Sequence, residues 1–479
     1  MPAIDRRTFL VGSASGLILF GLTACTGDTP TPTPSPTRSP EPSRVPTPTA
    51  FRRSAWSDDP FARGAISFMA VGSSPEDRQA LAEPVDSRLF LAGEAASSFP
   101  GTVAGAILSG RRVAGQVSAT AAQGDRIAVI GAGAAGLTAA RALADQGFEV
   151  VVIEGRDRIG GRILTIGPND DWPQPIELGA SIVEAGSSLA DQLTELGIAT
   201  QPLPVAEAET RTAEGVVVEE PAVGPDALNS AVAWAAGQPR DLSVAEALEG
   251  SGAGALGTSG DISDAAWLEH FLRTQLAVAT GAEADRISAW YGTTGVTGVE
   301  EQPEEGEAAL VLGNFSTLID SLAEGLDIAV SSPVSHVAEA EDGVSLRLGN
   351  GQTLTVERVV VTVPLGVLKA GTIEFDPPLP FRHREAIDAL GVGALEVIWL
   401  RFDEPFWQTE APIWRGVGAE SDVAAWVNLE PFTGEPMLMG IVVADAAERM
   451  AELSDEEVRA MAQRSLDPFV DAATPEPEE

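Results

Sequence analysis

Three glycines spaced as GxGxxG, namely Gly131, Gly133 and Gly136, are the residues whose chemistry is easiest to infer. Glycines at these positions allow a tight turn, close approach of the backbone to a phosphate, and close packing of a helix on a strand. Glu154 follows at the end of the next apolar run, where its carboxylate can accept hydrogen bonds from ribose hydroxyls. These residues therefore predict a site for the pyrophosphate and ribose of a dinucleotide.

The elements needed to position these residues can be read around them. The apolar run 126–130 predicts a strand, and 137–147 has apolar residues three and four apart, which predicts a helix. A second apolar run, 149–153, ends at Glu154. This order predicts a βαβ unit in which the first amides of the helix, Ala135 among them, face the phosphates. The alternative is a plain βαβ turn that binds no ligand.

A second glycine pair, Gly160 and Gly161, follows the acid and is flanked by arginines. Paired glycines allow another turn to approach the cofactor, and Arg162 can neutralise a phosphate. The run from Glu154 through Arg156 to Arg162 resembles the extended motif of glutathione-reductase-like FAD proteins, above all the flavin amine oxidases. This resemblance implies that the cofactor is FAD.

The resemblance to flavin amine oxidases continues along most of the chain. Residues 359–368 read VVVTVPLGVL, which is characteristic of that family, and 402–407 read FDEPFW in the familiar order. The stretch 176–181 resembles the family's strand beside the flavin ring, and a valine after 328–333 matches one whose backbone holds the adenine. The resemblance thus implies further cofactor contacts at Gly179, Ala180, Ser181 and Val334.

Two stretches that end the chain in relatives stand at the front of this one. Residues 56–68 resemble their tryptophan and DPF-like segment, and 89–110 resemble their second flavin-binding stretch, in wording closest to the polyamine oxidase and lysine demethylase branch. The simplest account is a circular permutation, in which a helix at 103–118 joins the first strand through 119–125. A fused fragment would leave a second copy, and none is evident. This segment is expected to add cofactor contacts at Gly93, Glu94, Thr102 and Val103.

The expected fold is α/β, with a glutathione-reductase-like FAD-binding Rossmann domain intertwined with a mixed α+β substrate-binding domain, circularly permuted. The permutation also predicts that 50–56 lies near Pro475. The expected segments are a twin-arginine lipoprotein signal (1–25), a Pro/Thr-rich linker (26–50), the permuted FAD-binding segment (51–120), the Rossmann segment (125–190), a helical region of the substrate domain (191–305), a middle FAD-binding segment (306–390), the substrate-domain sheet and helix (391–470) and an acidic tail (471–479).

The first residues predict export. Arg6 and Arg7 precede an apolar run, 11–22, that is short for a membrane span, and 22–25 reads LTAC, which resembles a bacterial lipobox. Cys25, the only cysteine, is the expected lipid attachment site, which would anchor the exported chain to the outer face of the cytoplasmic membrane. Since no other thiol exists, FAD is expected to bind without a covalent link through cysteine.

The amino-acid composition limits which binding partners are expected. Acidic residues outnumber basic ones by 70 to 30, a formal net charge of −40, which argues against binding nucleic acid. The charge is explained by a solvated surface or, more specifically, by attraction of cationic amines. His270, His336 and His383 have neither metal-ligand nor triad spacing, so no metal site is expected. The oligomeric state stays open.

The family resemblance implies hydride transfer from the carbon next to an amine nitrogen to flavin N5, leaving an imine that water hydrolyses, with oxygen or another acceptor reoxidising the flavin. Many relatives carry a lysine that holds a water near N5. Aligned on Gly391, Gly393 and Phe402, that position is Val397 here. A shift of one residue would place Glu396 there, but strand alternation would turn it to the opposite face. No catalytic side chain is therefore assigned.

The expected substrate is a small-molecule amine, with polyamines included. Trp56, Trp399 and Trp407 are candidates to line the pocket, although core packing explains each equally well. Two alternatives remain open: a desaturase-like or porphyrinogen-oxidase-like flavoenzyme on the same FAD framework, and a flavin-binding lipoprotein without turnover.

Overall fold

A five-stranded parallel sheet carries the glycine motif. In the computed structural model, which describes residues 43–257, 261–294, 296, 308–341, 343–418 and 421–470, the strand order is β13 (Asp327–Ala329), β5 (Glu149–Ile153), β4 (Arg126–Ile130), β17 (Arg358–Val361) and β3 (Leu89–Leu91). All neighbouring strands are parallel. The strands expected at 126–130 and 149–153 are confirmed.

Both faces of this sheet are covered, which explains why β4 reads as an unbroken apolar run. Ile127 and Val129 belong to the core beneath α2 (Val103–Ser118), α3 (Ala134–Ala144) and α9 (Ser316–Ala323). Ala128 and Ile130 belong to the core of the opposite face. That core contains residues of α1 (Pro75–Ala82), α10 (Leu365–Lys369), α11 (Phe381–Ala389) and a four-stranded sheet, ordered β16 (Thr353–Val356), β15 (Gly343–Leu348), β14 (Val334–Ala340) and β18 (Glu374–Asp376).

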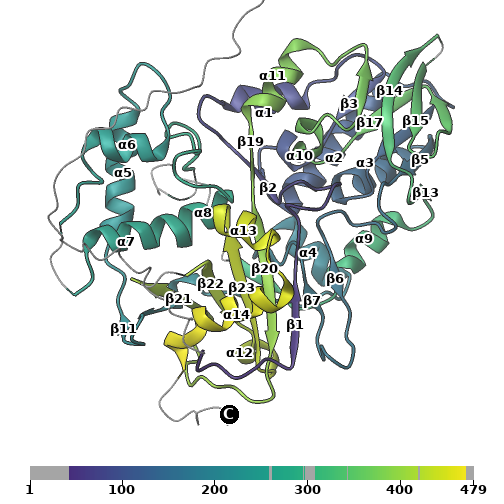
Figure 1. Cartoon of the computed structure of the whole chain (residues 1–479). Helices are drawn as coiled ribbons and strands as arrows, with labels where there is room; N and C mark the ends of the chain where they lie inside the picture. The colour runs from purple at the N-terminus through teal and green to yellow at the C-terminus, as the bar shows by residue number, and fades with distance from the viewer. Residues whose placement is uncertain are drawn as a thin grey trace, which may run out of the picture. The chain divides into compact units, whose positions relative to one another are not determined.

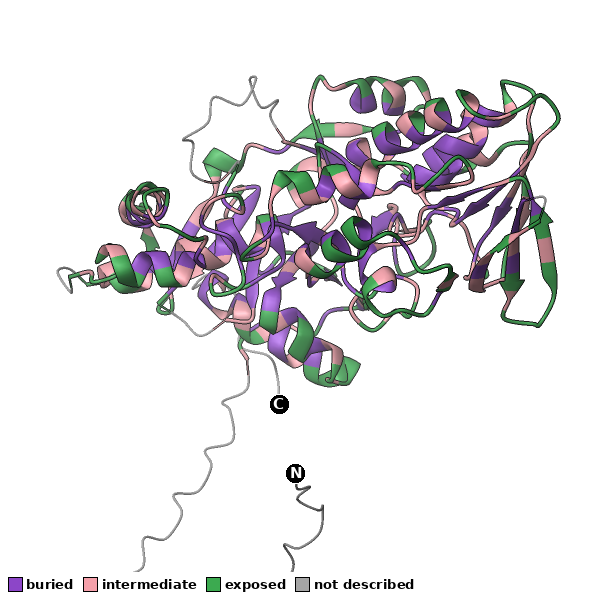
Figure 2. Ribbon diagram, turned by 90° about the horizontal axis from the view of Figure 1, so that it is seen from above, coloured by how far each residue is buried: buried purple, intermediate pink, exposed green. Residues whose placement is uncertain are grey.

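A seven-stranded sheet forms the second lobe (Figure 1). Its order is β1 (Ala50–Arg53), β20 (Leu395–Arg401), β23 (Met437–Val443), β22 (Val423–Asn428), β21 (Ile413–Val417), β10 (Glu209–Thr212) and β11 (Val217–Val218). Core residues of α13 (Ala444–Ala451) and α14 (Asp455–Leu466) pack against one face of it. The central strands of both large sheets, among them β4, β17, β20, β22 and β23, are mostly buried, as the purple strands inside the molecule in Figure 2 show.

A separate helical cluster extends the second lobe. It comprises α5 (Val223–Ala235), α6 (Val244–Ser251), α7 (Asp264–Phe271), a π-helical turn (Leu272–Leu276) and α8 (Ala277–Thr280). The remaining elements are β2 (Ile66–Phe68), β6 (Thr165–Ile166), β7 (Ile176–Glu177), β8 (Ile182–Glu184), β9 (Thr200–Pro202), β12 (Ala308–Val311), β19 (Gly391–Gly393), α4 (Ser188–Glu195), α12 (Glu430–Thr433) and short 3₁₀ turns at Glu94–Ala96, Val205–Glu207 and Asp467–Phe469.

Two expected segments differ from the structure in their contents. The range 51–120 was expected to serve FAD binding, yet its first strand, β1, pairs with β20 of the second lobe. The range 191–305 was expected to be helical, yet it also supplies β9, β10 and β11. Both differences arise because strands pair over long sequence separations, which local periodicity does not record.

The front of the described chain lies against its end. The Ser43 hydroxyl donates to Asp467 Oδ1 at 2.7 Å, and Gln463 Nε2 donates to the Val45 carbonyl at 3.1 Å. The expected signal segment with Cys25, most of the expected linker, and the expected acidic tail with Pro475 lie outside the described residues. Among the helices of the described part, none has both the length and the apolar character that a membrane span requires.

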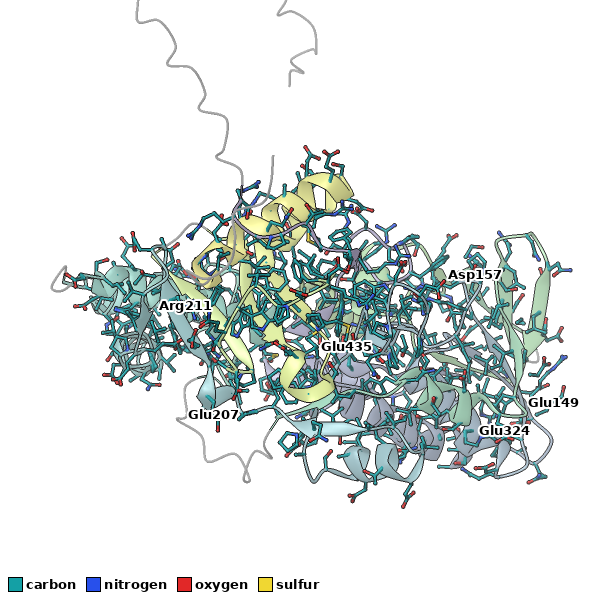
Figure 3. All side chains as sticks on the ribbon, turned by 90° about the horizontal axis from the view of Figure 1, so that it is seen from below. Glu149, Asp157, Glu207, Arg211, Glu324 and Glu435 are labelled. Carbon is teal, nitrogen blue, oxygen red and sulfur yellow. The ribbon has the colours of Figure 1, made fainter. Side chains whose placement is uncertain are left out.

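Acidic side chains lie on the surface of both lobes. Figure 3 labels Glu149 and Glu324 on the first lobe and Glu207 on the second, and all three are exposed. Their carboxylates can stay hydrated, so much of the net charge of −40 is compatible with a stable fold.

Candidate active site

A cavity of about 590 Å³ receives residues from both lobes. Every residue that the sequence assigned to the cofactor, from Gly93 in the first segment to Val334 in β14, lines this cavity. Val397 lines it from β20. These residues come from five separate stretches of the chain, namely 93–103, 131–162, 179–181, 334 and 397. Only the family resemblance, and no local pattern, could predict that they meet.

The glycine turn at the start of α3 can be made only by small residues. Gly131 has a φ of +107°, and a Cβ there would lie 2.6 Å from the Thr362 hydroxyl oxygen. A Cβ on Gly136 would lie 2.0 Å from the Gly131 carbonyl oxygen. The close packing leaves the first amides of α3, which begins after Gly133, at the edge of the cavity. A helix N-terminus in this position offers N–H donors and positive potential to a phosphate.

Glu154 does more than the sequence indicated. Its buried carboxylate accepts hydrogen bonds from the backbone N–H groups of Ala132 and Arg156, each at 2.8 Å. Each carboxylate oxygen retains a lone pair that can meet a ribose hydroxyl, since Glu154 also lines the cavity. The same side chain thus holds the glycine turn in shape and faces the ligand.

Arg156 is held by residues of the front segment of the chain. Its guanidinium pairs with Asp59 at 2.8 Å and lies 5.5 Å from the centroid of the Phe61 ring. Both partners precede the glycine motif by many residues, so no local signal could have predicted the pairing. The charge of Arg156 is therefore matched within the protein.

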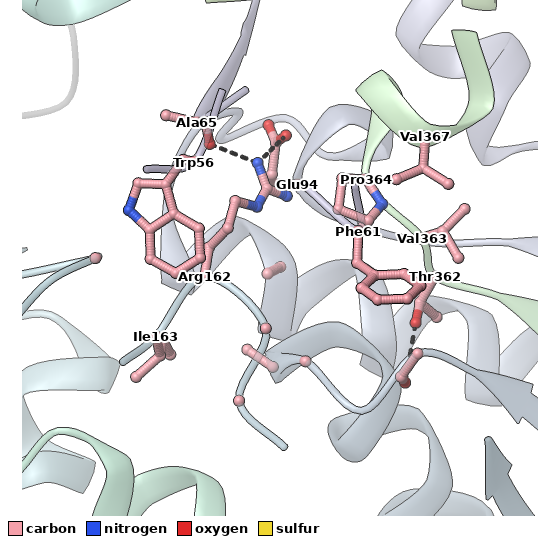
Figure 4. Close-up of a pocket in the computed structure, with 18 of the residues that line it drawn as sticks. Trp56, Phe61, Ala65, Glu94, Arg162, Ile163, Thr362, Val363, Pro364 and Val367 are labelled. Atoms are coloured by element: carbon pink, nitrogen blue, oxygen red, sulfur yellow. Dashed lines mark hydrogen bonds and ion pairs between the residues drawn. The ribbon is translucent and has the colours of Figure 1, made fainter. Parts of the chain in front are cut away.

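Arg162 and Glu94 form an ion pair in the wall of the cavity (Figure 4). Arg162 Nη1 donates to the Ala65 carbonyl at 2.5 Å and to Glu94 Oε1 at 3.2 Å. Burial raises the pKa of Glu94, but Arg162 and the hydrogen bonds from Ser67 and the Gly101 N–H outweigh it, so the pKa lies below its usual value. The sequence indicated that Arg162 could neutralise a phosphate, whereas the structure gives it a carboxylate partner first.

A second helix N-terminus borders the cavity. Thr102 caps α2, since its hydroxyl oxygen accepts the Gly105 N–H at 2.9 Å, and Val103 begins the helix. Gly93 has a φ of +143°, and a Cβ built on it meets open space. The stretch 179–181 passes close to Arg162, because a Cβ on Gly179 would lie 1.9 Å from the Arg162 carbonyl oxygen. Ala180 and Ser181 continue along the cavity wall.

Strand β20 presents Val397 to the cavity and Glu396 to the opposite side. Glu396 is buried, and its carboxylate accepts the Ser54 hydroxyl at 2.5 Å and the Ser57 N–H at 2.9 Å. Burial raises the pKa of Glu396 above its usual value. The alternation expected along this strand is confirmed, and Glu396 does not substitute for a lysine in the cavity.

The three tryptophans separate into two roles. Trp56 lines the cavity and donates its indole N–H to the Leu178 carbonyl at 2.8 Å. Trp399 and Trp407 pack in the cores on either side of the seven-stranded sheet. Within the described ranges, no group of His, Cys, Asp and Glu side chains is arranged to hold a metal ion.

Several lining residues carried no sequence motif. They are Val278, Leu395, Met439 and Ile441, which come from the second lobe. Alternating apolar residues in β20 and β23 could have identified the face, but not the cavity that it borders.

The residues present fit FAD. Two helix N-termini, a turn that only glycine can make, and a carboxylate at the strand end surround a cavity continuous with the apolar wall of the second lobe. The helix N-termini and the glycine turn suit the diphosphate of a dinucleotide, and the carboxylate suits its ribose. The apolar wall suits an isoalloxazine ring.

The model of the flavin containing amine oxidoreductase family matches residues 38–118 and 134–479. Polyamine oxidase 2 of Arabidopsis thaliana is 30% identical over 385 residues, which cover 73% of this chain and 73% of that protein. Lysine-specific histone demethylase 1 homolog 2 of the same plant is 30% identical over 352 residues, covering 67% of this chain and 44% of the demethylase. The solved structure of wild-type putrescine oxidase bound to putrescine has a TM-score of 0.57 at 23% identity, over 74% of this chain and 83% of that one.

The family match extends over well more than half of the chain and includes the front segment, 38–118, as well as everything from residue 134 onward. The chain therefore belongs to the flavin containing amine oxidoreductase family and is an FAD-dependent oxidoreductase.

Proposed function

We propose that this protein oxidises a small-molecule amine at the carbon next to nitrogen. The observation that carries the proposal is the meeting of the glycine turn, the Gly93–Glu94 segment and the wall of the second lobe at one cavity. When bound, FAD would supply the hydride acceptor. By their names, the relatives act on polyamines and putrescine, which makes these the first substrates to test.

The residues of the chain would bind the cofactor and orient the substrate. The first amides of α3 and α2 would hold the charged part of the cofactor, and Glu154 would hold its ribose. Val397 and Ile441 line the cavity with apolar side chains, which would exclude water from the reacting carbon and position its C–H bond.

The test is anaerobic titration of the purified holoprotein with a panel of amines, while the flavin absorbance is recorded. Bleaching by at least one amine is the expected result. Bleaching by none of them would favour the desaturase-like or porphyrinogen-oxidase-like alternative, or a flavin-binding protein without turnover. Acid precipitation should also release the yellow chromophore, because FAD is expected to be non-covalent.

We also propose that the chain is a circular permutation of the family order. Support comes from β3 and α2, which precede β4 in the chain but complete the five-stranded sheet and its helical layer. The contacts of 43–45 with 463–467 supply a second argument, since they bring the front of the described chain to its end.

Export and lipid anchoring are proposed from the sequence of the first 25 residues alone. The expected anchor is Cys25, on the outer face of the cytoplasmic membrane. Cys25→Ser should move the protein from the membrane to the soluble fraction with its FAD content unchanged. A variant that stays in the membrane fraction would disprove lipid attachment at this residue.

A further inference from the structure

The end of the cavity that lies against the seven-stranded sheet is apolar. Leu395 and Val397 of β20, Met439 and Ile441 of β23, and Val278 of α8 line it. Val397 stands opposite Ile441 in the antiparallel pair, so these alternate residues project from one face of the sheet. The part of a substrate that enters this end of the cavity must contact this face of the sheet.

The charged residues of the described lining lie elsewhere. They are Arg63, Glu94, Glu154, Arg156 and Arg162, and none comes from β20, β23 or α8. Glu94 is paired with Arg162, and Glu154 accepts two backbone N–H groups of the glycine turn. Neither carboxylate is thus placed to receive a cation at the apolar end.

The separation of the charged residues from the apolar end distinguishes amines with a second charge from amines with a hydrocarbon body. A second ammonium group that entered the apolar end would lose its water without gaining a carboxylate from the residues that the structure describes there, and burial of an unpaired charge is strongly unfavourable. A hydrocarbon group in the same place gains from leaving water. The wall therefore selects against one class of amine and for another.

We infer that the substrate is a monoamine with an apolar body, alkyl or aryl, which packs against β20 and β23. A substrate with a second positive charge is disfavoured at this wall. The inference rests on the proposed amine oxidation and narrows its substrate class, away from the polyamines and putrescine in the names of the relatives.

The test compares amines of matched length in anaerobic reduction of the holoprotein. Hexylamine and octylamine are each paired with the diamine of the same length, and butylamine extends the monoamine series. Each added methylene should lower the half-saturating monoamine concentration about fourfold until the cavity is filled. Each monoamine should surpass its diamine in reduction efficiency by on the order of tenfold or more.

A variant checks that the wall is responsible. Ile441→Glu places a carboxylate on the apolar face and should move the ratio of diamine to monoamine efficiency toward the diamine. Assays at about pH 8.5 are appropriate, because burial raises the pKa of an introduced carboxyl. Ile441→Leu is the matched control and should keep the wild-type preference, with FAD content and thermal unfolding reporting that each variant is folded.

The outcomes separate the two levels of the proposal. Diamines that reduce the wild-type protein as efficiently as monoamines would overturn the inference and leave amine oxidation standing. Failure of every amine to bleach the flavin would overturn the proposed function, and this inference with it.

Discussion

Val397 lines the cavity from β20, at the position where the family resemblance implies a lysine. Its side chain has neither a hydrogen-bond donor nor a charge, so it cannot hold a water or attract the negative charge that develops as oxygen is reduced. The wild-type holoprotein should therefore react slowly with oxygen and better with a quinone-like or protein acceptor.

Val397→Lys should accelerate reoxidation by oxygen on the order of tenfold, because it introduces a positive charge at the cavity wall. The measurement is the recovery of flavin absorbance after an anaerobically reduced sample is mixed with air-saturated buffer. Val397→Met is the matched control, with similar length and no charge, and should stay slow. Since a buried lysine is desolvated, FAD content must be verified first. A fast wild type that neither variant changes would show that oxygen reacts without help from this position.

Glu177 is a buried carboxyl outside the cavity whose hydrogen-bond partners, the Thr165 hydroxyl and the Phe315 N–H, are neutral. Burial raises the pKa of Glu177 from 4.5 to about 7, although these hydrogen bonds oppose the shift. The folded state therefore binds this proton more tightly than the unfolded state. Its contribution to stability is complete below pH 4.5 and is lost as the pH rises through about 7.

Glu177→Gln should remove that dependence, which amounts to roughly 3 kcal/mol over the full shift. The measurement is Tm between about pH 5 and pH 8. The wild type should lose more Tm across this range than the variant does. Glu195→Gln, at an exposed glutamate, is the control and should follow the wild type. Parallel curves for all three proteins would show that Glu177 is not protonated in the folded state.

At the scale of elements, the local sequence pattern predicted the helices and strands whose apolar residues recur with the period of that element. The runs 126–130 and 149–153 form strands with the expected bounds, and the helix expected at 103–118 does as well. Helix α14 begins at Asp455, because Ser454 caps it and its hydroxyl oxygen accepts the Glu457 N–H. Periodicity and capping are local properties, so they can be read without the fold.

Pairings between distant residues could not be read in this way. Arg156 meets Asp59, and Arg162 meets Glu94, across separations that no helix or strand period spans. The resemblance placed Glu94 and Arg162 at one cofactor, but only the fold shows that they neutralise each other. Similarly, β1 joins the sheet of the second lobe because it pairs with the free edge of β20. No property of residues 50–53 predicts this pairing.

The glycine turn allows a sharp test of an element. Gly136→Ala would push a Cβ to within 2.0 Å of the Gly131 carbonyl oxygen, so α3 must move away from β4. We expect a stability loss of about 1–3 kcal/mol and a large loss of bound FAD. Gly115→Ala in α2 is the matched control, because its Cβ meets open space. It should keep full FAD content and gain roughly 0.5–1 kcal/mol. Retained FAD in Gly136→Ala would contradict the packing described for this turn.

At the scale of the whole molecule, the chain passes back and forth between the two lobes several times. The segment from β1 to α2 serves the seven-stranded sheet first and the five-stranded sheet afterwards, and the chain returns to the second lobe after β17 and α11. Such interleaving makes the contacts independent of where the chain starts, provided that the joined ends lie close together. The contacts between 43–45 and 463–467 meet that condition at one joint, and α2 with β4 meets it at the other.

If the chain is permuted as proposed, a rearranged chain in the proposed family order should preserve the fold. A rearranged chain would run from residue 126 to 470, continue through a few Gly and Ser residues into residue 43, and end at residue 120. Because the same strands pair and the same cavity closes, it should bind FAD with a Tm within a few degrees of the natural order. A rearrangement of equal length that starts inside β5 is the control, and it should fail because it cuts a central strand. FAD content and thermal unfolding are the measurements. If the restored order is soluble but cannot bind FAD, residues 43–118 do not occupy the place that the family's C-terminal segment fills.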